Sequence, residues 1–140
     1  MISDVGLDDS LYYFLYRSNA RAELNQDAID AIVAEAQDRN ELMGLTGCLH
    51  YEDGLFFQWL EGPKGRLDEV AGMIRRDPRH EDMTDLAYGP AKARHFADWT
   101  MRSTDRDKAS LLDWFANHEV STIDRGAYAG SIGAFLMAMN

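Results

Sequence analysis

Two polar side chains stand inside runs of otherwise apolar residues, and they are the best candidates for chemistry in the chain. Gln58 lies in the run LFFQWL, and Tyr16 ends the run LYYFLY. On a strand, Gln58 shares a face with Phe56 and Leu60, so it is buried whichever face meets the core. An unpaired buried amide costs about 1–3 kcal/mol, so Gln58 must have a hydrogen-bond partner.

The chemistry of this pair is the exchange of hydrogen-bond donors and acceptors. An amide offers an acceptor oxygen and two donor hydrogens, so half a turn of the Gln58 side chain exchanges its roles. The phenol of Tyr16 also needs a partner when it is buried. The residues alone leave two interpretations open: a structural hydrogen bond between the two side chains, which we favour, and a pair that faces a ligand.

Three further features have a structural and a functional interpretation. Asn40 follows an expected helix, which favours a helix C-cap over a ligand contact. Trp99 and Met101 share one face of an expected strand, which favours core packing. The densest positive cluster consists of Arg75, Arg76 and Arg79. This cluster is typical of a solvated helix end, and in an acidic protein it is also the best place for an anionic ligand.

Common catalytic and metal-binding motifs are missing from the sequence. No histidine pair has metal-ligand spacing on the expected helices, so we interpret the four histidines as unrelated. There is no glycine-rich phosphate loop, and we interpret the Gly62–Gly65 segment GPKG as a turn. The single cysteine, Cys48, lies in a strand-like run without an acid–base motif, and it excludes an intrachain disulfide.

The elements that position these residues are expected in the order β-α-β-β-α-β. The expected strands are 11–16, 44–51, 55–60 and 84–89. Asp53-Gly54 predicts a hairpin between the second and third strands. Apolar residues at helical spacing predict helices at about 25–39 and between Pro63 and Asp77. A fifth strand at 95–103 and two helices, at 107–117 and about 123–139, complete the chain.

This order predicts an α+β fold, a ferredoxin-like sandwich with an extra fifth strand and two helices on one sheet face. The groove between those helices is the natural ligand cleft. We expect residues 1–103 to form the ligand-binding domain and residues 104–140 a helical extension that packs on the sheet. The extension would cover the opposite face of Leu55, Phe57 and Trp59. Its covering apolar residues are Leu111, Leu112, Phe115, Ile123, Phe135 and Leu136.

Charge and length narrow the partners. The chain has 140 residues, one domain's worth, and a net charge of −10. Such a surface repels phosphate backbones and anionic lipid, so we expect no nucleic acid or membrane partner. The N-terminus lacks a basic targeting segment, and the longest weakly polar stretch, 126–139, is shorter than the roughly 20 residues of a membrane span. We therefore expect a cytoplasmic protein.

Taken together, these residues closely resemble the BLUF family, sensors of blue light using FAD. The resemblance runs from Leu11 to Ser103. It consists of LYYFLYRS with Tyr16, Asn40 ahead of MGLTG, LFFQWLEG with Gln58, DPRH at 77–80, and FADWTM with Trp99 and Met101. Each motif alone is weak, but five in order on a matching element pattern are specific.

The resemblance implies FAD between the two helices, with FMN or riboflavin able to substitute. Tyr16 would donate an electron and a proton to the photoexcited flavin, and Gln58 would relay through its amide to give a red-shifted signalling state. Asn40 would bind the pyrimidine edge of the ring. The remaining implied positions are Ile32 and Ile74 around the ring, Trp99 and Met101 beside Gln58, and Arg79 and His80 in a matching motif.

Two positions depart from the family pattern. Many members have Arg where this chain has Met73, so Arg75 or Arg76 would have to replace that polar contact. Many have Ser where this chain has Thr100, which keeps the hydroxyl. The resemblance does not settle which of Trp99 and Met101 lies next to Gln58.

The resemblance implies a photoreceptor and not an enzyme. The alternatives are a small flavin-dependent reductase and a ferredoxin-like acyl phosphatase, which would need an open substrate site to which no residue can be assigned. Because no effector domain follows in this sequence, we expect the signal to pass to a separate downstream protein or through a change of assembly such as a homodimer.

Overall fold

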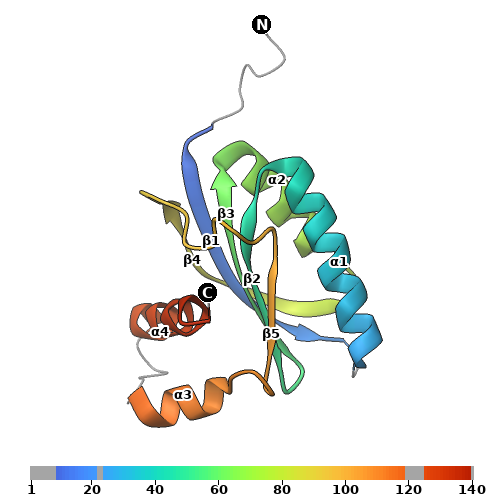
Figure 1. The fold of residues 1–140 in the computed structure, drawn as a ribbon, viewed down its shortest axis with the longest axis vertical. Helices are drawn as coiled ribbons and strands as arrows, with labels where there is room; N and C mark the ends of the chain where they lie inside the picture. Colours follow the sequence, from blue (N-terminus) through green and yellow to red (C-terminus); the bar gives the residue numbers. More distant parts are fainter. Residues whose placement is uncertain (1–8, 22–23, 119–124, 140) are drawn as a thin grey trace, which may run out of the picture.

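A computed structural model describes residues 9–21, 24–118 and 125–139, which form one five-stranded sheet with helices on both faces (Figure 1). The strand order is β4-β1-β3-β2-β5. The strands are β1 (Leu11–Ala20), β2 (Thr46–Glu52), β3 (Leu55–Pro63), β4 (His80–Pro90) and β5 (Arg102–Asp105). The helices are α1 (Gln26–Met43), α2 (Lys64–Arg75), α3 (Leu111–His118) and α4 (Arg125–Met137).

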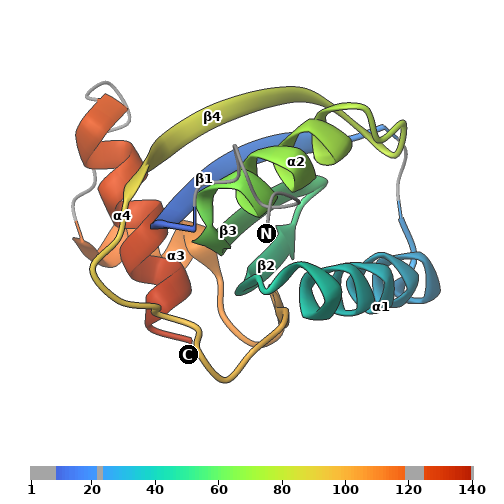
Figure 2. The ribbon, with the colours of Figure 1, turned by 90° about the horizontal axis from the view of Figure 1, so that it is seen from above.

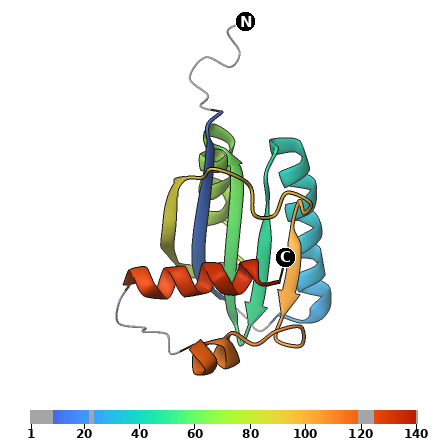
Figure 3. The same cartoon turned by 60° about the vertical axis from the view of Figure 1, so that its left-hand side comes forward.

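The first four strands form the expected ferredoxin-like arrangement. β1 pairs antiparallel with β3 and β4, and β2 pairs antiparallel with β3, while β5 is parallel to β2. Helices α1 and α2 lie on one face of the sheet, and α4 crosses the other (Figures 2 and 3). The predicted fold class is confirmed, with the extra fifth strand at the β2 edge.

The alternation of β3 divides the core into two clusters. Phe56 and Leu60 pack beneath α1 and α2, while Phe57 and Trp59 pack on the face that α4 crosses. Strand pleating places neighbours on opposite faces, so each side of this strand meets a different layer. Gly47 allows β2 to approach β3 closely, because a Cβ there would lie 2.0 Å from the Trp59 carbonyl oxygen.

The predicted hairpin joins β2 and β3. Asp53 and Gly54 have φ values of 53° and 81°, the left-handed pair that a tight hairpin needs. Helix α1 begins where the sequence predicts, because the Asn25 side chain accepts a hydrogen bond from the Ala28 N–H. It runs on to Met43 and ends at Gly44, which has φ 70°.

Several predicted boundaries are wrong. The fifth strand is not 95–103 but Arg102–Asp105, so Trp99 and Met101 lie in the irregular segment that precedes it. The fourth strand begins at His80 rather than at residue 84, and the first strand extends to Ala20.

Helices α3 and α4 contribute a second apolar cluster on the face opposite α1 and α2. Leu111 and Ile132 are buried there against Phe57 and Trp59. The members of this cluster from the two helices also include Phe115, Phe135 and Leu136. Ile123 and the side chain of Leu112 lie outside the described residues. In the part of the chain that the structure describes, no helix is long and apolar enough to cross a membrane.

Candidate functional site

A cleft opens between α1 and α2 over the middle of the sheet. Its floor comes from β1, β2 and β3, and its mouth lies at the segment between α2 and β4. The lining residues are Tyr16, Ile32, Glu35, Ala36, Arg39, Leu49, Phe56, Gln58, Ile74, Asp77, Arg79 and His80. Six of the predicted site residues are therefore brought together: Tyr16, Ile32, Gln58, Ile74, Arg79 and His80.

Tyr16 and Gln58 form a hydrogen-bonded pair on the cleft floor. They lie opposite each other in the β1–β3 ladder, and the Tyr16 hydroxyl donates to Gln58 Oε1. Both side chains are buried. Burial raises the pKa of Tyr16 well above its ordinary value, although the Arg39 charge acts in the opposite direction, so the phenol is neutral near pH 7. The hydrogen bond that the residues alone favoured is confirmed, and the pair also lines a cleft.

The amide nitrogen of Gln58 retains donor capacity. Its contact in the described part of the chain is the Met101 sulfur, 3.7 Å away, and a thioether is a weak acceptor. Met101 is 1% exposed, whereas Trp99 is 37% exposed with the Arg102 guanidinium 4.6 Å from its ring centre. Met101 is thus the inward residue of the two. The shared strand face predicted for them does not exist.

Asn40 is not the C-cap that the residues alone favoured. It lies within α1, and its backbone carbonyl accepts from Leu45, 2.9 Å away, while Gly44 takes the cap position. The Asn40 side chain is fully buried and donates to the Thr100 carbonyl at 2.6 Å. Its oxygen accepts from the guanidinium of Arg39 at 3.2 Å. Asn40 therefore ties α1 to the segment before β5, beside a residue that lines the cleft.

The walls of the cleft are apolar and its mouth is charged. Ile32 from α1 and Ile74 from α2 belong to or pack against the same buried cluster as Tyr16. Arg79 binds Asp77 at 2.7 Å and Glu35 at 2.8 Å, which links the mouth to α1. The hydrogen bond from Arg79 lowers the pKa of Asp77, so this carboxylate is charged at neutral pH.

His80 and the arginine cluster have distinct environments. The two ring nitrogens of His80 contact Ser18 Oγ at 2.7 Å and the Ile74 carbonyl at 2.5 Å, so the ring bridges β1 and α2. Arg75 is bound to Asp85 through two contacts of 2.9 and 2.7 Å and does not line the cleft. Arg76 and Met73, which is 42% exposed, also lie outside the cleft lining, so the replacement of a polar contact by Arg75 or Arg76 stays a prediction.

Arg39 is one of six cleft residues that were not predicted as site residues, the others being Glu35, Ala36, Leu49, Phe56 and Asp77. Burial lowers the pKa of Arg39, with the interaction with Tyr16 opposing that shift. The signal was available, because residues 32, 36 and 39 have the spacing of one helical face. An arginine at the end of an apolar series is usually a solvated residue, and here it turns back to Asn40.

Comparisons with known proteins agree with this geometry. The sequence profile for "BLUF: Sensors of blue-light using FAD" matches residues 11–102. The chain is 36% identical over 101 residues to the photoactivated adenylate cyclase subunit beta of Euglena longa, covering 71% of this chain and 12% of that protein. It is 34% identical over 91 residues to the blue light- and temperature-regulated antirepressor BluF of Escherichia coli (strain K12), covering 65% of this chain and 23% of that protein.

A solved structure covers most of the chain. The dark state of BlrB, a BLUF protein, superposes with a TM-score of 0.74 and 32% identity over 91% of this chain and 98% of that one. The curated relatives named above are much longer, and this chain spans less than a quarter of their length. The α+β fold of this chain is thus shared with a BLUF protein of known structure. The chain belongs to the BLUF family of blue-light sensors that use FAD.

Proposed function

We propose that this chain is a blue-light receptor that binds FAD in the cleft between α1 and α2, with Tyr16 and Gln58 as its photoactive pair. The observation that carries the proposal is the buried hydrogen bond from Tyr16 to Gln58 on the cleft floor. The amide nitrogen of Gln58 meets a weak acceptor in the described part of the chain, so it has a donor to offer to a ring carbonyl.

The lining of the cleft fits a flavin ring. Ile32 and Ile74 would pack on the two faces of the isoalloxazine, since they come from the two flanking helices. Asn40 is buried next to the lining residue Arg39; it uses one N–H on the Thr100 carbonyl and would offer the second to the pyrimidine edge. Arg79 and His80 would frame the mouth. FMN and riboflavin share the ring and would substitute for FAD.

The photoresponse follows from what the two side chains can exchange. Bound FAD supplies absorption of blue light and an excited state that withdraws an electron. Tyr16 gives up one electron, and its phenolic proton moves along the existing hydrogen bond to Gln58 Oε1. An electron and a proton would then return to Tyr16. If the proton comes back from Oε1, Gln58 is left as a rotated amide; if it comes from the Gln58 nitrogen, Gln58 is left as the tautomer with a hydroxyl at Oε1, and in both cases it presents a donor where it presented an acceptor. The added donor gives a red-shifted signalling state.

Met101 and Trp99 have unequal roles in this proposal. Met101 contacts the Gln58 amide directly, so it would adjust when that amide changes. Trp99 lies half-exposed beside Arg102 and acts as a neighbour. Both residues lie in the segment before β5, and the rearrangement of Gln58 would reach that segment. We therefore keep both as photoactive positions.

The division of labour along the chain is part of the proposal. Residues 1–103 form the flavin-binding sensor, and residues 104–140 form an extension that covers the second sheet face and relays the signal. The chain acts as a sensor without enzymatic turnover, in the cytoplasm, on a separate effector protein or through a homodimer. The named relatives include a photoactivated cyclase and an antirepressor, which supports an effector as the target.

A light-minus-dark absorption spectrum of the FAD-loaded protein tests this function. We expect a yellow protein whose flavin band shifts to longer wavelength under blue light and returns in the dark. A protein that refuses FAD, or one that binds it and bleaches without recovery, contradicts the proposal. Hydrolysis of acyl phosphates by a colourless preparation would instead support the phosphatase alternative.

A further inference from the structure

Glu61 is a fully buried carboxylate that lies outside the cleft. It follows Gln58 by three residues on β3, and it is 0% exposed. Its neighbour on the same face is Trp59, whose indole N–H donates to Glu61 Oε1 at 3.0 Å. A buried carboxylate is stable only where hydrogen bonds replace its lost hydration, so its partners reveal what it holds.

Each carboxylate oxygen of Glu61 accepts two hydrogen bonds, so Glu61 has four donors. Besides the indole of Trp59, the donors are the Thr46 hydroxyl at 2.8 Å and the backbone N–H groups of His95 and Phe96 at 2.8 and 2.7 Å. The last two belong to the irregular segment 91–101 before β5, which we call the strap. Hydrogen bonds to an ionised acceptor are stronger than neutral ones. Glu61 is therefore a firm anchor for the first half of the strap.

The second half of the strap is anchored over the cleft side. The Trp99 carbonyl accepts from the Gly47 N–H at 3.1 Å, and the Thr100 carbonyl accepts from the Asn40 side chain. The strap ends at Met101, whose sulfur contacts the Gln58 amide nitrogen. Only four residues separate Phe96, held by Glu61, from Met101. A displacement of the strap at Glu61 therefore reaches Met101 through a short segment that is held at both ends.

We infer that Glu61 is a positioning residue for the photoresponse: it sets where the strap places Met101 against the Gln58 amide. The inference rests on the proposed function, because it assigns to Glu61 an effect on the amide that switches. Glu61 acts from the far face of the sheet and touches no cleft residue through its side-chain hydrogen bonds. Its effect should therefore appear in the kinetics of the signalling state rather than in flavin binding.

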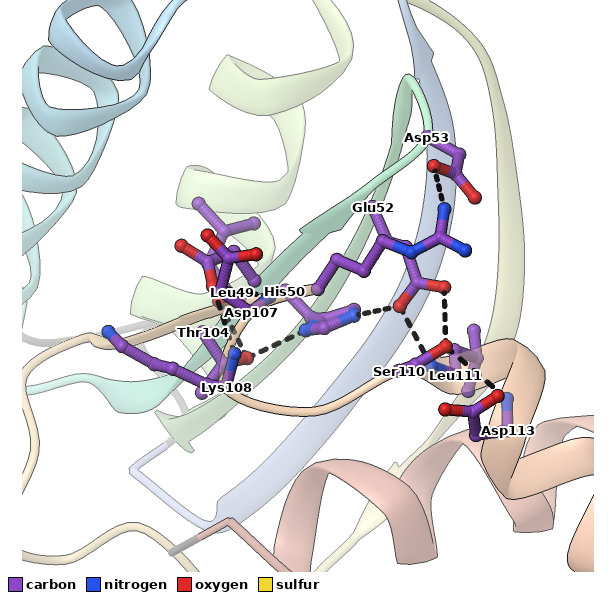
Figure 4. A network of polar contacts seen from close by, with 12 residues as sticks. Leu49, His50, Glu52, Asp53, Thr104, Asp107, Lys108, Ser110, Leu111 and Asp113 are labelled. Carbon is purple, nitrogen blue, oxygen red and sulfur yellow. Dashed lines mark hydrogen bonds and ion pairs between the residues drawn. The ribbon is translucent and has the colours of Figure 1, made fainter.

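A second buried carboxylate provides a matched control. Glu52 on β2 accepts from the Leu111 N–H at 2.7 Å and from Ser110 Oγ at 3.3 Å, and it contacts His50 Nε2 at 2.9 Å (Figure 4). These bonds hold the start of α3, whereas those of Glu61 hold the strap. The same substitution at the two sites therefore perturbs two different segments with one chemical change.

The experiment compares Glu61→Gln with Glu52→Gln in the full chain. The amide introduced at 61 carries N–H groups toward donors that the carboxylate accepted from, so it releases part of the strap. We expect faster hydrogen–deuterium exchange at residues 93–101 without flavin or light, unchanged FAD affinity, and a dark-recovery rate altered by about threefold to tenfold. Glu52→Gln should raise exchange at 111–118 and alter the recovery rate less than about twofold.

Each outcome decides the inference. If wild type shows no light response, the proposed function fails, whatever Glu61 does. If wild type responds and Glu61→Gln recovers at the wild-type rate, Glu61 is a structural anchor only and the inference is wrong. If Glu61→Gln does not fold, Thr46→Val removes a single one of the four donors, and it should change strap exchange and recovery in the same direction by a smaller factor. An unchanged Thr46→Val would then overturn the inference.

Discussion

Two faces of one strand differ in how completely the protein satisfies its own polar groups. On the cleft face of β3, Gln58 accepts from one phenol and offers its nitrogen to a thioether. On the opposite face, three residues further on, Glu61 accepts four hydrogen bonds from N–H and O–H donors. His50 and Glu52 resemble Glu61 in this respect, because they are buried and hydrogen-bonded on the face covered by α3 and α4.

The difference shows where rearrangement is cheap. A group with four strong partners loses much when it moves, whereas an amide with one strong partner can exchange donor and acceptor ends at a small cost. The cleft face is thus suited to a ligand and a switch, and the opposite face to a fixed frame. A sensor needs both, because a switch transmits only if its surroundings move as a unit.

The largest expected effect comes from removing the phenol on the switching face. Tyr16→Phe keeps the ring that stacks 5.5 Å from Phe14 and deletes the hydroxyl that donates to Gln58. We expect FAD to bind and the red-shifted state to be lost completely. The light-minus-dark spectrum measures this, and a normal photocycle in Tyr16→Phe would show that another residue is the donor.

The next test makes the same deletion on each face. Ile132→Ala empties a fully buried site under α4, and we expect it to lower the free energy of unfolding by about 2–5 kcal/mol while the red shift persists. Ile32→Ala removes a half-buried cleft wall, so it should cost less stability and weaken FAD binding. Urea unfolding and FAD titration separate the two. Loss of the red shift in folded Ile132→Ala would break the distinction between the faces.

A smaller effect is expected at the two residues near the end of the strap. Met101→Leu conserves volume but removes the sulfur that faces the Gln58 amide, so we expect the dark-recovery rate to change by about threefold to tenfold. Trp99→Phe alters a half-exposed ring and should change that rate by less than about twofold. Recovery followed by absorbance checks both. The reverse ranking would mean that Trp99, not Met101, is the inward residue.

The smallest expected effect is the pH dependence of folding stability that comes from His50, on the sheet face opposite the cleft. Burial lowers the pKa of His50 from its ordinary 6.5, with the Glu52 hydrogen bond opposing the shift. The unfolded chain then binds a proton at a pH where the folded protein does not, so stability should fall as the pH drops below about 6.5, by less than about 1.4 kcal/mol per unit. Urea unfolding at several pH values measures the slope. His50→Gln should flatten it, and an unchanged slope would assign the dependence to other groups.

Local patterns were enough to predict the fold class and the central pair. The alternation of side chains along a strand predicted that Gln58 shares a face with Phe56 and Leu60. Those three residues do share the face beneath the helices. The turn at Asp53-Gly54 fixed the neighbouring strand, because few residues tolerate its backbone conformation. Such signals lie within a few residues of each other, so a sequence can display them directly.

What could not be predicted depends on partners far along the chain. The alternating residues at 95–103 imitate a strand, but the carboxylate of Glu61 binds two of their N–H groups and holds them in the strap. Glu61 itself looked like the polar end of a strand. No pattern in the neighbouring sequence indicates that four donors hydrogen-bond to its carboxylate. Arg75 likewise resembled a free cation until the fold brought Asp85 beside it.

The central claim is that the Gln58 amide is the switch, and the light-minus-dark absorption spectrum of FAD-loaded Gln58→Leu tests it most directly. Leu fills similar space without a donor or an acceptor, so the variant should bind FAD and show no red shift under blue light that shifts the wild type. A reversible red shift of normal size in Gln58→Leu would contradict the account.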